Sequence, residues 1–154
     1  MEPQRKMSTG FRKIDIDQYS EDVFKEEEMN SLEPQSPAGV DEQEVRRLLQ
    51  SGKKADALRA ILSAAPLATK SQATKDRVAD LMMQVLLATK SSEMDSALEK
   101  LEPELIDILM KYVYRGFENP VDGSSAHLLL WHDKVFAAGG VGSIVRVLTD
   151  KKRV

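Results

Sequence analysis

The chain of 154 residues contains no cysteine, and this absence removes several kinds of chemistry at once. Disulfide bonds, a thiolate nucleophile and cysteine-ligated zinc are all excluded. A reducing compartment is therefore the simpler expectation. The remaining composition, with 42% hydrophobic residues, suits one domain with a core of ordinary size.

Long apolar runs are missing as well. No window approaches the roughly 18 consecutive apolar residues that a helix needs to cross a bilayer. The first residues, MEPQRKMSTGFRK, lack the apolar core of a secretory signal. We therefore expect a cytoplasmic protein with no membrane partner.

The sequence also lacks an excess of positive charge. Residues 1–40 hold 5 basic and 9 acidic side chains, whereas residues 41–154 hold 17 basic and 16 acidic ones. A nucleic-acid-binding domain is usually basic, with a dense stripe of Lys and Arg. The near-neutral body predicts no nucleic-acid partner.

The first 40 residues are expected to form an extended or disordered acidic arm. They lack helical periodicity, are interrupted by Gly and Pro, and contain the acidic run at 26–28. Within them, FRKIDIDQY at 11–19 alternates apolar and polar residues, so an extended chain would place Ile14 and Ile16 on one side. The segment 11–24 is either part of a nonspecific tail or a short element that orders on a partner.

From residue 41 onward, apolar residues recur with the period of an α-helix. Helix starts are predicted at Asp41 (with Glu44), Ser71, Ser92 (with Asp95), Pro103, and Ser124 or Ser125. Helix ends are predicted at Gly52, before Pro66, and at the pair Gly139-Gly140. The segment 103–117 is apolar over so wide an arc that we expect neighbours on two of its sides.

The sequence thus predicts an all-α body over 41–154, with about seven short helices in a compact, solenoid-like array. The last segment, at 141–148, could also form a strand because SIVRVLT is rich in β-branched residues. A lone strand would have nothing to pair with, so a helix is favoured.

The glycine-rich stretch GGVGS at 139–143 invites comparison with a phosphate-binding loop. Such a loop follows a strand and carries a Lys-Ser or Lys-Thr pair, whereas here a predicted helix precedes it and no lysine follows. One helix ending and another beginning is the better explanation.

Metal and nucleophilic chemistry have weak candidates only. His127 and His132 are five residues apart, about 500° around a helix, and so do not share a face. Ser124 and Ser125 beside His127 lack an elbow sequence or a third member of a triad, and helix capping explains them better. No metal, cofactor or catalytic residue is predicted.

Aromatic residues offer the more informative candidates. Trp131, Tyr112 and Tyr114 either lie in the core or anchor an interface, where aromatics near Lys111, Arg115 and similar residues form a buried centre with a polar rim. The basic group Lys70, Lys75 and Arg77 is either a solvated helix face or a match for an acidic patch.

Four stretches of sequence resemble a known protein family. FRKIDIDQY at 11–19, TKSQATKDR at 69–77, LMKYVYRGFE at 109–118 and WHDKVFAAGGVGSIVRVLT at 131–149 closely resemble the smallest subunit of the actin-related protein 2/3 complex, a seven-protein actin nucleator. The resemblance covers nearly the whole chain. It is weaker around residues 25–40 and in the second and fourth helices.

The resemblance implies a non-catalytic structural subunit without a cofactor. It implies docking of the body on the core small subunit and the β-propeller subunit, and an arm that tethers actin-related protein 2. Actin filaments are then partners through the complex, in the cytoplasm, the cytoskeleton, cell projections and the nucleus.

Carried over by position, the resemblance assigns two sets of residues. The arm contact comprises Phe11, Arg12, Lys13, Ile14, Asp15, Ile16, Asp17 and Tyr19. The expected docking residues of the body are Lys111, Tyr112, Tyr114, Arg115, Phe117 and Trp131. The alternative hypothesis is a free-standing helical adaptor that binds a peptide on its concave face.

Overall fold

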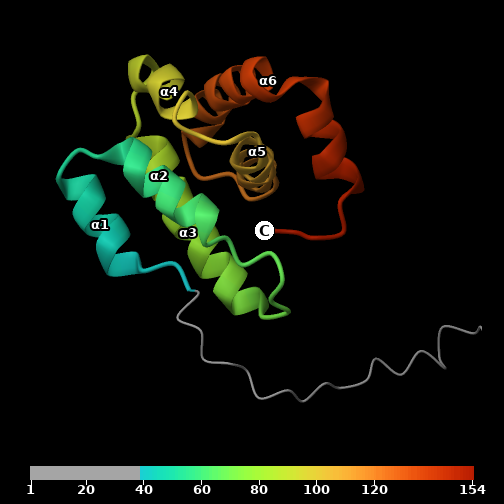
Figure 1. Ribbon diagram of the computed structural model, residues 1–154, viewed down its shortest axis with the longest axis horizontal. Coiled ribbons are helices and arrows are strands. Elements are labelled where there is room, and N and C mark those ends of the chain that lie inside the picture. Colours follow the sequence, from blue (N-terminus) through green and yellow to red (C-terminus); the bar gives the residue numbers. More distant parts are fainter. Residues whose placement is uncertain (1–38) are drawn as a thin grey trace, which may run out of the picture. The chain divides into compact units, whose positions relative to one another are not determined.

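The computed structural model describes residues 39–154, and these residues form helices and loops without a strand. The helices are α1 (Glu42–Gln50), α2 (Lys54–Ser63), α3 (Gln72–Ala88), α4 (Ser91–Leu98), α5 (Pro103–Glu118) and α6 (Ser124–Thr149). The predicted all-α class is confirmed (Figure 1). The arm segment 11–24 and all of its expected contact residues lie outside the described residues.

The sixth and seventh predicted helices together make up α6, which is interrupted at Gly140. This residue has φ 66° and ψ −171°, a conformation that only glycine adopts readily. The predicted joint at Gly139-Gly140 is therefore present, and the segment after it is a helix rather than a strand. Figure 1 shows the two halves of α6 pointing in different directions.

Capping explains two of the helix starts as predicted. The Asp41 carboxylate accepts the backbone N–H of Gln43 at 2.9 Å and that of Glu44 at 3.3 Å. The Ser71 hydroxyl accepts the N–H of Thr74 at 3.4 Å. Each bond satisfies an N–H that has no partner inside its helix.

Two other predicted caps are wrong. Helix α4 begins at Ser91, with Glu93 Oε2 accepting the N–H of Lys90 at 3.0 Å, so Ser92 lies inside the helix. Helix α6 has Gly123 as its N-cap, with φ 76°. The Ser124 hydroxyl instead bonds both main-chain groups of Val121, because the tight turn before the helix brings them within reach.

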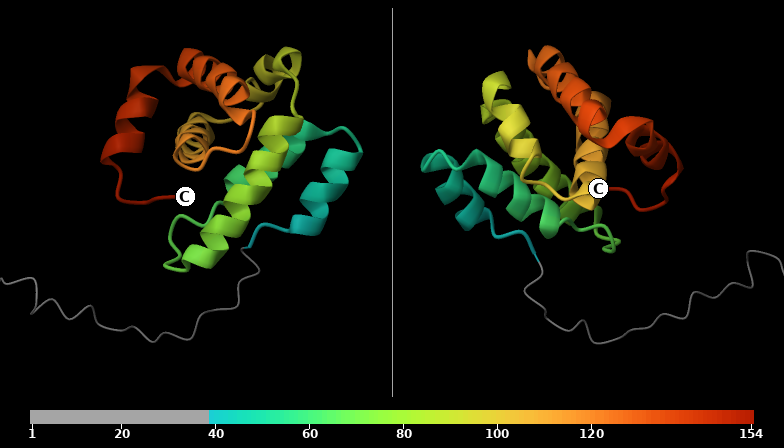
Figure 2. Two further views of the ribbon diagram at one scale, coloured as in Figure 1. Left: turned by 180° about the vertical axis from the view of Figure 1, so that it is seen from behind. Right: turned by 45° about the horizontal axis from the view of Figure 1, so that its top comes forward.

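Helices α1, α2 and α3 pack as one group and α5 with α6 as another, as two further views show (Figure 2). Between them lies one apolar core, and its largest fully buried side chains include Leu58, Met82, Leu109, Met110 and Trp131. Helix α5 contacts α2, α3 and α6. Its wide apolar arc is thus buried against neighbours on more than one side, as predicted.

None of the helices in residues 39–154 is both long and apolar enough to cross a bilayer. Within the same residues, no group of three or more His, Asp or Glu side chains is placed to hold a metal ion.

Candidate docking surface

Four aromatic rings form a cluster where α5 meets the first half of α6. The ring of His132 lies 5.6 Å from that of Tyr114, 6.2 Å from that of Phe117 and 6.4 Å from that of Phe136. Tyr114 and Phe117 meet edge to face at 6.0 Å. The Tyr114 hydroxyl is 3.4 Å from His132 Nε2, so the imidazole packs close to α5.

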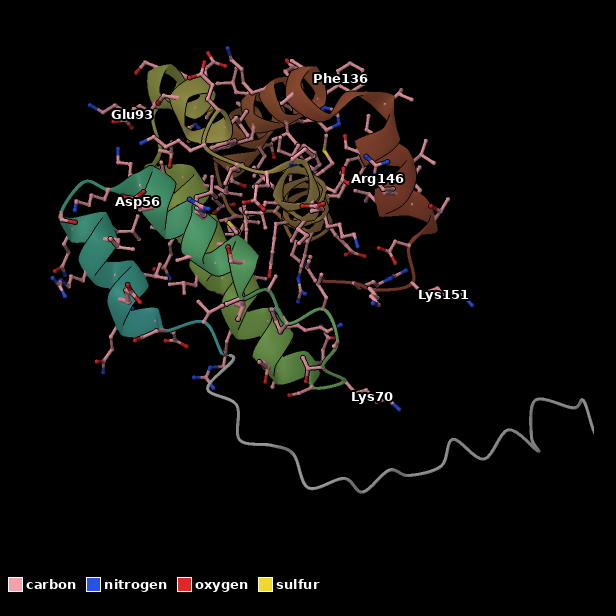
Figure 3. The ribbon with its side chains drawn as sticks, in the orientation of Figure 1. Asp56, Lys70, Glu93, Phe136, Arg146 and Lys151 are labelled. Carbon is pink, nitrogen blue, oxygen red and sulfur yellow. The ribbon has the colours of Figure 1, made fainter. Side chains whose placement is uncertain are left out.

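The cluster continues into an exposed apolar face. Phe136 is 41% exposed, and Leu129, seven residues earlier on the same side of α6, is 56% exposed. Figure 3 shows Phe136 at the upper edge of the molecule. We call Tyr114, Phe117, Leu129, His132 and Phe136 the aromatic surface.

Helical geometry explains why these residues remain outside. An adjoining side of α6 presents Leu128, Trp131 and Val135 to the core, and all three are fully buried. Because α6 is apolar around most of its circumference, the core cannot cover every side of it. Rigid aromatic and aliphatic side chains at a surface are typical of the centre of a protein–protein interface.

The two histidines point to different neighbours and form no common site. His127 Nε2 lies 2.9 Å from the carbonyl oxygen of Leu86 in α3, whereas His132 belongs to the aromatic surface. Among residues 39–154, His127 therefore packs against α3, and His132 forms part of the surface.

Two of the expected docking residues lie in the core. Tyr112 is 1% exposed and Trp131 is 0% exposed, so neither side chain has surface to offer a partner. Burial raises the pKa of Tyr112 to about 12, against a smaller opposite effect of the Arg115 charge. The sequence could not separate these buried aromatics from Tyr114 and Phe117, because all four occur in the same two helices.

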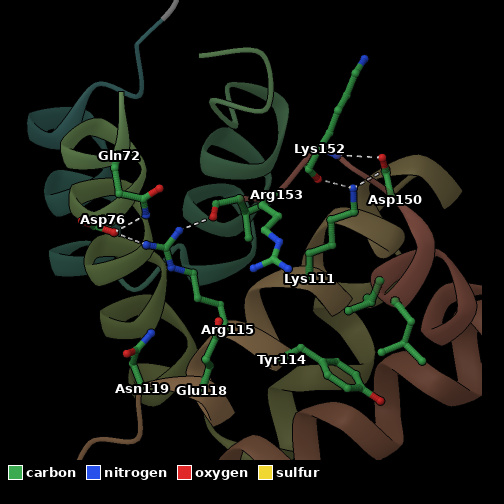
Figure 4. A pocket seen from close by; sticks show the side chains of 13 residues that line it. Gln72, Asp76, Lys111, Tyr114, Arg115, Glu118, Asn119, Asp150, Lys152 and Arg153 are labelled. Atoms are coloured by element: carbon green, nitrogen blue, oxygen red, sulfur yellow. Dashed lines mark hydrogen bonds and ion pairs between the residues drawn. The ribbon is translucent and has the colours of Figure 1, made fainter. Parts of the chain in front are cut away.

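Lys111 and Arg115 bind the last residues of the chain. Lys111 Nζ donates to Asp150 Oδ2 at 2.5 Å and to the carbonyl of Lys152 at 2.9 Å. Arg115 donates to the carbonyl of Val154 and pairs with Asp76 (Figure 4). The hydrogen bond from Lys111, together with the N–H of Lys152, lowers the pKa of Asp150.

An open pocket of about 670 Å³ lies beside this C-terminal segment, and Lys111, Tyr114 and Arg115 line it. Both cations are already engaged by Asp150, Asp76 and main-chain oxygens. The arrangement therefore holds the C-terminal segment against α5 and α3 rather than offering positive charge to a ligand.

The glycine-rich stretch is a helix joint. The Ser143 hydroxyl donates to the carbonyl of Gly140 at 2.7 Å, and Ser143 is fully buried. This bond ties the Ser143 side chain to the carbonyl three residues earlier, across the first turn after the break.

Six exposed apolar residues of α6 were not among the predicted docking residues: Leu129, Leu130, Phe136, Val141, Val145 and Leu148. For Leu129, Leu130 and Phe136 a signal was present in the sequence. The run HLLLWHDKVF has more apolar positions than one helix face can hold, so some of them must face outward.

Comparison with known proteins gives the surface its context. Residues 10–154 match the family model described as ARP2/3 complex 16 kDa subunit (p16-Arc). The chain is 45% identical over 148 residues to actin-related protein 2/3 complex subunit 5-B of Xenopus laevis, covering 96% of this chain and 97% of that protein. It is 43% identical over 148 residues, with the same two coverages, to the human actin-related protein 2/3 complex subunit 5-like protein. It is 39% identical over 113 residues, 73% of this chain and 80% of the relative, to subunit 5 of Dictyostelium discoideum.

Proposed function

The chain belongs to the family of the 16 kDa subunit of the ARP2/3 complex, and on this premise we propose that it is a non-catalytic structural subunit of that actin-nucleating complex. The observation that carries the proposal is the family match over residues 10–154, which takes in both the arm segment and the whole helical body. The cytoplasmic actin cytoskeleton, cell projections and the nucleus are the corresponding locations.

The body supplies the docking function. The aromatic surface combines Tyr114 and Phe117 of α5 with exposed Leu129 and Phe136 of α6. Aromatic anchors of this kind contribute most of the binding free energy in many interfaces. We assign to this surface the contact with the core small subunit or the β-propeller subunit.

The arm supplies the tethering function. An extended chain at 11–24 would place Ile14 and Ile16 on one side, because apolar and charged residues alternate there in the sequence. Such a segment suits binding to actin-related protein 2. Residues 25–40, 16 in number, lead to the body, and a flexible linker of that length spans on the order of 22 Å.

The tether acts through effective concentration. A partner held at two weak contacts by one chain rebinds at one while the other persists, so the pair holds more tightly than either contact alone. The linker also permits actin-related protein 2 to move when the complex is activated. Retention with movement is what branch formation on a mother filament requires of such a subunit.

The docking function is tested with the double substitution Leu129→Asp/Phe136→Asp in the full chain, co-expressed with the other subunits. We expect the variant to fold, because both side chains are exposed, and to be recovered with the complex at least 10-fold less well. Val121→Asp, at a residue 53% exposed in the loop before α6, is the matched control. Equal recovery of the double variant and the wild type would remove the aromatic surface from the proposal.

The tethering function is tested by deleting residues 1–30. The truncated subunit should fold and enter the complex, while retention of actin-related protein 2 and the rate of branching both fall. Ile14→Ser/Ile16→Ser should reproduce the loss, whereas Met29→Ser/Leu32→Ser, which removes two apolar arm residues outside the segment, should not. Wild-type branching by the truncated complex would contradict the tether.

A further inference from the structure

The second half of α6, residues 141–149, presents its apolar side to solvent. Val141, Val145 and Leu148 are 65%, 50% and 73% exposed. Their spacing of four and three residues places them in one row along the helix, about 10 Å long at 1.5 Å per residue. We call these three residues the outer row.

Another side of this half-helix already packs on the body. Ser143 is fully buried, and Ile144 and Val147 contact the apolar core. The outer row therefore contributes nothing to the core, although aliphatic side chains at a free surface lose the benefit of burial. A contiguous exposed apolar row is the usual mark of an interaction site.

Charges beside the outer row are distributed unevenly. Arg146 Nε lies 2.7 Å from Asp107 Oδ2, and the hydrogen bond to Asp107 raises the pKa of Arg146. Asp150 pairs with Lys111. Beyond these pairs, the end of the helix is followed by the exposed cations Lys151, Lys152 and Arg153, and Figure 3 shows Lys151 pointing away from the body.

From this arrangement we propose that the outer row binds an amphipathic helix of a neighbouring subunit, with acidic residues at the end that meets Lys151, Lys152 and Arg153. Two turns of a helix match the length of the row, with apolar anchors at intervals of three and four residues. Acidic residues on the partner complement the basic end and fix the direction of the helix. The inference rests on the proposed function, because the partner is taken to be another subunit of the complex.

A second copy of this chain fits the outer row less well. In a parallel pair, the two basic ends at residues 151–153 would face each other. In an antiparallel pair, each basic end would meet the joint at 139–142, which contains no acidic residue.

A membrane surface also fits less well. Helices that lie in a bilayer interface carry Trp or Phe on the apolar side and rows of Lys or Arg along the polar side. The outer row has no aromatic residue, and the one basic residue within the half-helix, Arg146, is paired with Asp107. The three cations lie at one end of the helix, which suits a directional protein contact.

A photo-crosslinker tests the inference directly. The crosslinking amino acid p-benzoylphenylalanine replaces Val145 in the full chain, the complex is assembled with all its other subunits, and the crosslinked peptide is identified by mass spectrometry. We expect one helical segment with acidic residues at one end. Crosslinking to a second copy of this chain, or no crosslink in the assembled complex, would overturn the inference. Crosslinking to phosphatidylserine vesicles and to no subunit would also overturn the inference.

Binding measurements supply the energetic test. Val145→Asp/Leu148→Asp should weaken incorporation about 10–100-fold, as expected from burial of two aliphatic side chains. Lys151→Glu/Lys152→Glu should reduce it and also reduce its dependence on salt. The matched control is Leu130→Asp, at a residue 45% exposed on the first half of α6.

The two proposals fail in different ways. If the double variant at the outer row incorporates like the wild type while the double variant at the aromatic surface does not, this inference fails and the proposed function stands. If the wild-type subunit is not recovered with actin-related proteins at all, the proposed function fails and this inference fails with it.

Discussion

The indole Nε1 of Trp131 donates a hydrogen bond of 3.0 Å to the carbonyl oxygen of Leu86, which ties α6 to the last turn of α3. Carbonyls in the last turn of a helix have no N–H partner within the helix. His127 Nε2 lies 2.9 Å from the same oxygen, and the N–H of Thr89 donates to it at 3.3 Å. One carbonyl thus joins two helices that lie far apart in sequence.

Replacing Trp131 with Phe should destabilise the body by about 2–4 kcal/mol, through the smaller ring in a fully buried position and the lost hydrogen bond. Because Trp131 is the only tryptophan, unfolding in denaturant is followed by far-ultraviolet circular dichroism rather than fluorescence. His127→Ala, which removes the less buried of the two partners, should cost less. A larger loss of stability from His127→Ala than from Trp131→Phe would contradict this prediction.

Gly116 is a second point of close packing. A Cβ atom there would lie 2.9 Å from Leu128 Cδ1 and 3.0 Å from Met83 Sδ. Leu128 is fully buried and has little room to move. We expect Gly116→Ala to destabilise the protein by about 1–2 kcal/mol, since overpacking outweighs the gain in helix propensity.

Gly142 is the matched control, because a Cβ atom there would meet only the guanidinium of Arg146, at 3.1 Å, and this exposed group can shift within its ion pair with Asp107. Gly142→Ala should stabilise the protein by about 0.5–1 kcal/mol. Denaturant unfolding of the two variants should thus give changes of opposite sign. Stabilisation by both changes would show that α5, α6 and α3 adjust to an added methyl group.

Much of the fold followed from local sequence. Asp41 and Ser71 were predictable caps because the capping bond involves only neighbouring residues. Gly140 was a predictable joint because its glycine neighbours and the apolar periods on either side all indicate a break. The prediction failed at Ser124, where the serine turned back to Val121 and the preceding glycine took the cap position.

The surface was less predictable because exposure depends on what packs nearby. Tyr112 and Tyr114 are two residues apart in one helix, yet one lies in the core and the other beside His132. Sequence spacing gives their angular separation but not the position of α3 and α6 around them. The engagement of Lys111 with Asp150 likewise depends on the return of the chain after α6, which no local pattern encodes.

Tyr112 provides a test that depends on pH. Its hydroxyl is buried and has no hydrogen-bond partner among residues 39–154, and burial raises its pKa to about 12. A tyrosine in the unfolded chain ionises near pH 10, so the folded state holds this proton more tightly. The resulting stability is fully present below about pH 10 and falls by roughly 2–3 kcal/mol as pH rises to about 12.

Tyr112→Phe should change stability little at pH 7, because it removes an unpaired hydroxyl, and should lessen the loss between pH 10 and 12. Denaturant titrations of both proteins at pH 7, 10 and 12 measure the difference. Equal losses of stability at pH 12 would show that a group other than Tyr112 causes the alkaline loss.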